Sequence, residues 1–159
     1  MSELHERRFL NCPYNRAREL LFEAVADAVE TGSGRMVRLT LPIPGGQIVK
    51  DVAVEIKRGT DPAGFDQPWA LHWDPIDGMY PGFDGTLTVE ADETYRTSQL
   101  VLQGSYTPPG GAAGEAFDAA IGSHIAATTA KEVLRKVGDD LEQRYQSEEQ
   151  AKTAGASDA

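Results

Sequence analysis

The sequence has a single cysteine and no long apolar run. With Cys12 alone, an intrachain disulfide and a zinc site built from several thiolates are both excluded. No segment approaches the ~20 apolar residues that a membrane-spanning helix needs, so no membrane span is predicted. Residues 1–8 lack the apolar core of a signal peptide. These features predict a cytoplasmic protein of a bacterial type.

Positive charge is also scarce, with 15 lysines and arginines against 25 aspartates and glutamates and a net charge of −10. Nucleic acids and anionic lipids are bound by basic surfaces, so neither is expected as a partner. The chain also lacks a P-loop, a G-x-G-x-x-G turn, an H-E-x-x-H pair, paired C-x-x-C motifs and a G-x-S-x-G elbow. Its three histidines are too scattered for a metal site. We therefore predict that the protein has no metal site and no cofactor, and we assign no catalytic residue.

What the chain does contain is short segments in which apolar and polar residues alternate, as is typical of half-buried strands. The clearest pair covers 86–92 and 100–106, with a polar turn between them and a Pro-Pro-Gly corner after them. The links between strands are short, so neighbouring strands should pair antiparallel. Further strands are predicted over 4–11, 35–41, 47–57 and 68–74.

Two segments show the spacing of apolar residues that is typical of helices. The first runs from Pro13 to Gly32, and the second from about Gly114 to Arg144 without a proline. The remaining residues, 146–159, have no apolar anchor beyond alanine, which predicts a disordered acidic tail. A chain of 159 residues is expected to form one domain, here over 1–145.

The two halves of the second predicted helix differ. Its C-terminal half has one apolar stripe, from Val133 to Leu141, whereas Phe117, Ile121 and Ile125 point more than a quarter-turn away from that stripe. A sheet can cover only one of these two sides. The aromatic segment 69–83, a second subunit or a ligand would have to cover the other, so a homodimer is one of three alternatives.

This order of elements predicts an α+β protein with the helix-grip plan. In that plan a curved antiparallel sheet, here of about six to seven strands, wraps around a long C-terminal helix, and one helix follows the first strand. Several stretches also resemble members of the START-like superfamily, also called SRPBCC. These stretches are Leu71–Trp73, Tyr80–Val89, Leu102–Gly110, Gly114–Asp118 and Ile125–Thr128.

The resemblance implies a cavity between the sheet and the last helix that takes a small apolar or aromatic molecule. It implies no shared catalytic motif, because the superfamily includes lipid and steroid carriers, polyketide cyclases, ring-hydroxylase subunits and co-chaperones. Aromatic side chains with a few polar groups would line such a cavity, although aromatic residues also pack in strand-rich cores without any ligand. The candidates are Trp69, Trp73, Tyr80, Phe83, Tyr106, Phe117, Ile121 and His124.

Three functions stay open on the sequence. The first, favoured by the missing catalytic signatures, is the binding of a small hydrophobic molecule without chemistry. The second is an enzyme similar to polyketide cyclases or dehydratases, with His124 and Tyr106 as acid and base candidates. The third is a protein-interaction module that uses the Phe117, Ile121 and Ile125 face.

The sequence predicts the surroundings of two histidines. His124 is one turn from Ile121 on the second predicted helix and is expected to be buried. His72 alternates with Leu71 and Trp73, so it should face the opposite side of its strand. The nearby Asp74 and Asp84 stand beside proline or glycine and are expected to form turns.

Overall fold

The structure is a computed structural model of the chain, and it describes residues 2–30, 35–43, 45–58, 67–74, 82–107 and 123–157. Six strands and two helices are described. In chain order they are β1 (Ser2–Leu10), α1 (Tyr14–Glu30), β2 (Arg35–Ile43), β3 (Gly46–Lys57), β4 (Trp69–Trp73), β5 (Gly82–Ala91), β6 (Ser98–Thr107) and α3 (Ser123–Ser157).

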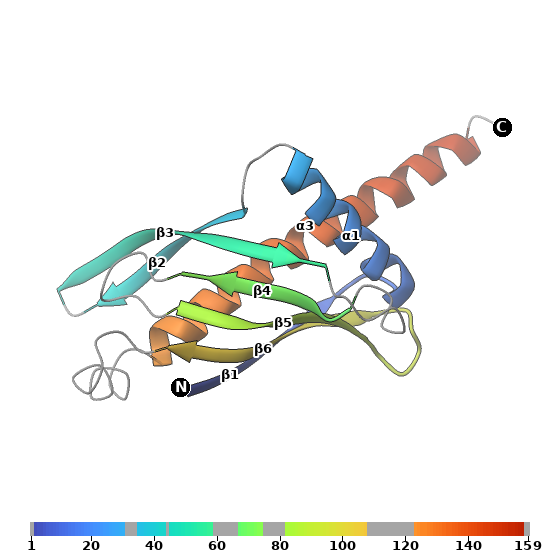
Figure 1. Ribbon diagram of the computed structural model, residues 1–159. Helices are drawn as coiled ribbons and strands as arrows, with labels where there is room; N and C mark the ends of the chain where they lie inside the picture. Colours follow the sequence, from blue (N-terminus) through green and yellow to red (C-terminus); the bar gives the residue numbers. More distant parts are fainter. Residues whose placement is uncertain are drawn as a thin grey trace.

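All six strands belong to one antiparallel sheet with the order β1-β6-β5-β4-β3-β2. β1 and β2 are therefore the edge strands, although only α1 separates them in the sequence. The long helix α3 crosses one face of this sheet, and its main contacts are with β1, β2 and β6 (Figure 1). A sheet that touches one helix with both of its edges has to curve around it, so the predicted α+β helix-grip plan is confirmed.

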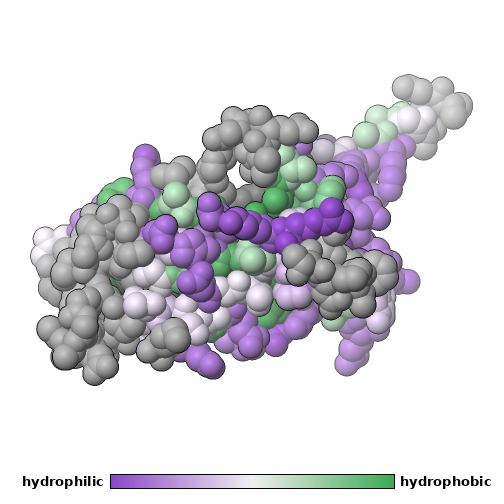
Figure 2. All heavy atoms as spheres, viewed as in Figure 1, coloured by the Kyte–Doolittle hydropathy of each residue, from purple (hydrophilic) through white to green (hydrophobic). Residues whose placement is uncertain are grey.

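The face of the sheet toward α3, which we call the inner face, carries the apolar half of each alternating strand. Residues directly opposite in an antiparallel pair share a face, so the strand registers place these side chains together. The buried ones are Leu4, Leu10, Val52, Val54, Trp69, Leu71, Trp73, Phe83, Leu87, Val89, Leu100, Leu102 and Tyr106. Hydrophilic side chains cover much of the surface seen in Figure 2.

α1 covers the end of the inner face near the β5–β6 turn. Its predicted apolar stripe is confirmed, with Ala17, Leu20, Leu21 and Ala24 buried. The Pro13 carbonyl accepts the first helical hydrogen bond from Ala17 N, and Tyr14 N donates to the Tyr95 carbonyl, 3.1 Å away. The start of α1 is thus tied directly to the turn between β5 and β6.

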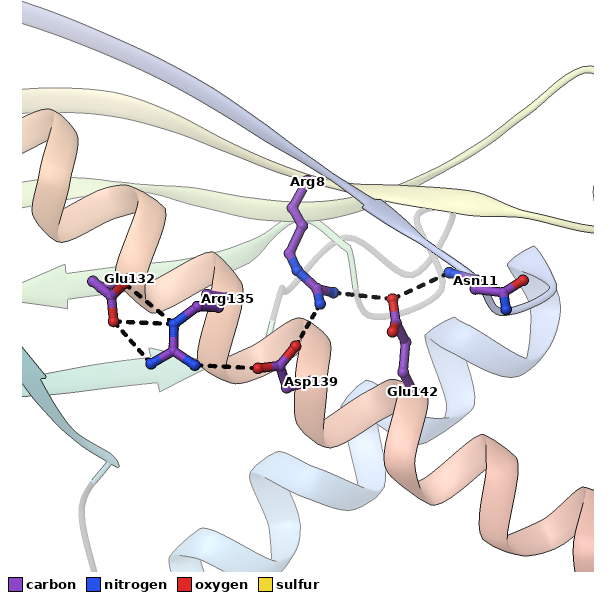
Figure 3. Close-up of polar contacts among 6 residues, drawn as sticks. All are labelled: Arg8, Asn11, Glu132, Arg135, Asp139 and Glu142. Atoms are coloured by element: carbon purple, nitrogen blue, oxygen red, sulfur yellow. Dashed lines mark hydrogen bonds and ion pairs between the residues drawn. The ribbon is translucent and has the colours of Figure 1, made fainter.

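Ion pairs join α3 to β1 and to α1. Arg8 of β1 lies between Asp139, 2.6 Å from Nη2, and Glu142, 3.2 Å from Nη1 (Figure 3). The Arg8 guanidinium occupies the space that a Cβ on Gly138 would need. Gly138 is therefore the point at which β1 and α3 interlock through a side chain.

The C-terminal part of the chain differs from the prediction. We expected the helix to end near Arg144 and residues 146–159 to be disordered, but α3 continues to Ser157 and extends beyond α1 (Figure 1). Arg16 of α1 pairs with Glu148, and the segment is rich in alanine, glutamate and glutamine, which favour helices intrinsically. Helix propensity and the ion pair with Arg16 thus stabilise this segment as a helix, although it has no apolar residues larger than alanine to bury.

Two glycines face each other across β5 and β6 on the inner face. Gly85 pairs with Gly104, and a Cβ on Gly85 would lie 2.3 Å from the Gln103 carbonyl and 2.5 Å from the Phe83 ring. A Cβ on Gly104 would lie 2.3 Å from the Asp84 carbonyl. Backbone atoms cannot yield as a flexible side chain can, so both positions require glycine.

We predict that Gly85→Ala lowers the free energy of unfolding by about 3 kcal/mol, at the upper end of overpacking effects. Gly46→Ala is the matched control, because a Cβ at that strand position meets no atom within 4 Å and should change stability by less than about 0.5 kcal/mol. Urea unfolding followed by tryptophan fluorescence measures both. Equal stability of the two variants would contradict the close approach of β5 and β6.

A second prediction concerns the interlock of Arg8 and Gly138. In the otherwise unchanged protein, Gly138→Ala displaces the guanidinium from Asp139 and Glu142, and this loss offsets the gain of about 1 kcal/mol that alanine brings to a helix interior. In an Arg8→Ala background the gain should appear in full, as a rise of about 1 kcal/mol in the free energy of unfolding. Equal effects of Gly138→Ala in the two backgrounds would show that the two residues are independent.

Candidate functional site

A row of three aromatic side chains crosses the inner face of the sheet. Trp73 of β4 lies opposite Phe83 of β5, and Phe83 lies opposite Tyr106 of β6. The Trp73 and Phe83 rings are stacked, with centroids 4.5 Å apart and planes 18° from parallel. The row is buried, with exposed fractions of 0% for Trp73, 2% for Phe83 and 4% for Tyr106. Three of the candidate residues therefore lie side by side on the inner face.

The row lies at the end of the sheet where the described part of α3 begins (Figure 1). The buried side chains in this part of α3 are small: Ala126, Thr129 and Ala130. Thr129 Oγ1 donates to the Ile125 carbonyl at 2.7 Å, which satisfies the hydroxyl within the helix. The fully buried side chains of the helix are thus small here, and those on the inner face of the sheet are larger.

Trp69 shares the inner face but lies at its other end, beside α1. Its ring meets that of Phe22 edge-on, at 6.3 Å between centroids, and only 3% of it is exposed. Near it, Gln67 Oε1 accepts a hydrogen bond of 2.5 Å from Val89 N. Trp69 therefore belongs to the packing between α1 and the sheet, separate from the row.

The other predicted site residues fall into two groups. Tyr80, Phe117 and Ile121 lie outside the described residues. His124 lies in the first turn of the described part of α3, and its side chain is exposed. The expectation that His124 is buried is therefore wrong, because that turn directs it to solvent and not toward the sheet.

On the outer face of the sheet, which points away from α3, a histidine lies within hydrogen-bond distance of two aspartates. His72 faces away from Leu71 and Trp73, as expected, and its Nδ1 and Nε2 lie 2.6 Å from Asp84 and 2.9 Å from Asp74. Burial lowers the pKa of His72, but its hydrogen bonds to Asp84 and Asp74 together raise the pKa above the ordinary value. The expectation that Asp84 forms a turn is wrong, because it lies within β5 opposite His72.

Other potential reactive groups do not form a catalytic arrangement among the described residues. Burial raises the pKa of the Cys12 thiol to about 11, although Arg16 acts in the opposite direction. At neutral pH Cys12 is therefore a thiol, and the thiolate is the reactive form. No set of three or more histidine, cysteine or acidic side chains in the described segments could hold a metal ion. None of the described helices is long and apolar enough to cross a membrane.

A surface groove of about 450 Å³ lies between α1 and the C-terminal part of α3. Ion pairs surround it: Arg16 contacts Glu148, and Arg144 contacts Asp27 and Asp140. Pockets for small molecules are predominantly apolar, so this polar groove does not match the predicted ligand. Its lining residues are Glu23, Asp140, Gln143, Arg144, Ser147 and Glu148.

The glycine pair beneath the aromatic row is a feature that the sequence analysis missed. The spacing contains a signal for it, because Phe83-x-Gly85 and Gly104-x-Tyr106 mirror each other about the turn at 92–97. Once that turn is taken as the centre of a hairpin, the two glycines must pair. Phe83 and Tyr106 then pair as well, on the same face.

Comparison with known proteins gives matches in structure alone. No protein-family model and no curated protein matches the sequence. TTHA0849 from Thermus thermophilus is 12% identical with a TM-score of 0.50, and the match covers 88% of this chain and 97% of that one. The di-domain ARO/CYC BexL from the BE-7585A biosynthetic pathway is 18% identical with a TM-score of 0.52, covering 89% of this chain and 47% of that one.

A third similar structure is Ara h 8.0201, which is 15% identical with a TM-score of 0.50, covering 92% of this chain and 98% of that one. Identities this low concern the fold alone, since one fold supports many unrelated functions. Together with the strand order and the long helix that both sheet edges contact, these matches show that the chain has the helix-grip fold.

Proposed function

We propose that this protein binds a small, uncharged aromatic or apolar molecule between the inner face of the sheet and the N-terminal half of α3. The observation that carries this proposal is the row of Trp73, Phe83 and Tyr106, which is buried on the sheet face that α3 crosses, while the fully buried side chains at the start of α3 are small. Aromatic side chains supply large contact area for a ligand at low cost in conformational entropy.

The way in which α3 is supported favours a site at this place. Its main contacts are with α1, with the edge strands β1 and β2 and with β6, and the central strands β4 and β5 are not among them. Large buried side chains of β4 and β5, including Trp73 and Phe83, lie on the inner face and can change rotamer, whereas the hydrogen bonds of the sheet fix the backbone around them. A ligand can therefore enter by side-chain movement without unfolding a strand.

The chemistry of the inner face favours an uncharged ligand. Its buried side chains are almost all apolar, and the buried polar ones in the described segments are Gln67, Ser98 and Thr129. Gln67 and Ser98 already hydrogen-bond to Val89 N and the Cys12 carbonyl, and Thr129 to the Ile125 carbonyl. No cationic side chain is among the buried residues that the structure describes, and a ligand anion would also meet the net charge of −10.

The same surroundings support binding without chemistry over a cyclase-like reaction. The two candidates for acid and base catalysis occupy different environments, since Tyr106 is buried on the inner face and the His124 side chain is exposed. Acid–base partners must lie within hydrogen-bond reach of the reacting group. Of the third alternative, the interaction face, only Ile125 is described; it is half-buried and packs against the core.

We predict that 2-naphthol, an uncharged bicyclic aromatic molecule, binds with a dissociation constant of about 0.1 mM, as its size allows. The chain has only two tryptophans, so their two indole N–H signals in a proton–nitrogen NMR spectrum can be assigned with Trp69→Phe and Trp73→Phe. The Trp73 signal should shift on titration, and the Trp69 signal, beside α1, should shift much less.

Naphthalene-2-sulfonate is the matched control ligand, because it has the same rings and a full negative charge. It should bind at least about tenfold more weakly, a difference of about 1.4 kcal/mol. The proposal is wrong if 2-naphthol leaves the Trp73 signal unmoved, or if the sulfonate binds equally well.

A further inference from the structure

The Phe83 ring occupies an unusual position on the inner face. One of its faces stacks on Trp73 at 4.5 Å, and its tip lies over the Gly85–Gly104 pair. The tip atom Cζ is 2.5 Å from the place of a Gly85 Cβ and 2.8 Å from that of a Gly104 Cβ. The ring thus fills the space that the absence of two side chains leaves open on the sheet.

If Phe83 changed rotamer, this space would have a defined shape. Its floor would be the bare backbone of Gly85 and Gly104, and one wall would be the Trp73 ring. The Phe83 ring is flat and lies nearly parallel to that wall, at 18°. A space that admits a flat ring against an aromatic wall selects for planar ligands, because stacking requires a planar partner.

We infer that Phe83 occupies the ligand position in the free protein, and that a planar aromatic ring displaces it to stack on Trp73 above the Gly85–Gly104 pair. This inference rests on the proposed function and makes it more specific. It names planar aromatic molecules as the ligand class, and it gives Phe83 the role of an internal competitor of the ligand.

An internal competitor lowers the apparent affinity, because only those molecules in which its ring has moved aside can bind the ligand. The apparent association constant is the intrinsic one multiplied by the fraction of such molecules. Minor conformations are commonly populated at about 0.1–10%. Removal of the competing ring should therefore increase the affinity for a planar aromatic ligand by about 10-fold or more, up to about 1,000-fold.

The experiment compares 2-naphthol binding to the full chain and to Phe83→Ala, with Phe83→Leu as a milder second variant. Leu87→Ala is the matched control, because Leu87 is fully buried on the same face of the same strand and lies beside Trp69 in the register. Both alanine variants create a cavity, but only Phe83→Ala removes the competing ring. Decahydro-2-naphthol, with the same skeleton but puckered saturated rings, is the control ligand.

We expect Phe83→Ala, and to a smaller extent Phe83→Leu, to bind 2-naphthol at least about tenfold more tightly than the unchanged protein. Leu87→Ala should show no such gain, and decahydro-2-naphthol should gain less than 2-naphthol. An unchanged or weaker affinity of the Phe83 variants overturns the inference. An equal gain in Leu87→Ala, or an equal gain for the saturated ligand, overturns it as well.

These outcomes separate the inference from the proposed function. If the unchanged protein binds 2-naphthol and the Phe83 variants bind it no better, the proposed function stands and the inference fails. If only the Phe83 variants bind it, the ligand does not displace Phe83 from the unchanged protein, and the proposed function fails together with the inference that rests on it. If none of these proteins binds it, both fail.

Discussion

The structure depends on how α3 is held by the two edges of one sheet. β1 and β2, which lie at opposite ends of the strand order, both contact this helix. Arg8 reaches from β1 across Gly138 to Asp139 and Glu142 (Figure 3), and Arg16 and Arg144 join α3 to α1. A helix that is fixed at the rims of a curved sheet cannot also lie directly on the middle strands. The space over the middle strands must therefore be filled by side chains or by a ligand.

The inner face meets this requirement with large aromatic side chains where α3 has small ones. The row of Trp73, Phe83 and Tyr106 is buried on the face that α3 crosses, and the fully buried residues at the start of α3 include Ala126 and Ala130. Beneath Phe83 the two paired glycines remove the side chains that would otherwise compete for the same volume. In this arrangement a ligand ring can take the place of a protein ring. The free-energy cost of a rotamer change is small compared with that of disrupting a strand.

Much of this arrangement can be predicted from the sequence, because it follows from local patterns. The period of two in each strand separates Trp73 from His72 and assigns them to opposite faces. The short links predict antiparallel pairing, and the turn at 92–97 fixes the register that aligns Phe83 with Tyr106. The apolar stripe of α1 follows from its period of 3.6 in the same way.

The remaining features depend on contacts between distant parts of the chain or on quantities that a pattern does not contain. The pairing of His72 with Asp84 requires β4 and β5 to be adjacent, which the local pattern around Asp84 does not show. That pattern contains a glycine next to Asp84, and the glycine suggested a turn. The exposure of His124 depends on how α3 is rotated relative to the sheet, and helical spacing alone does not fix that rotation. The extension of α3 past Arg144 depends on helix propensity and on Arg16, which is 132 residues away from Glu148 in the sequence.

The central claim is that a ligand is held between the inner face of the sheet and α3. The most direct test is an isotope-filtered nuclear Overhauser experiment on the labelled protein with unlabelled 2-naphthol. This account predicts contacts from the ligand to the Trp73 ring and to the methyl groups of Ala126 and Ala130, on the two sides of the site. Contacts only to exposed residues such as Phe9 and Tyr95, or to the polar groove at Ser147, would contradict it.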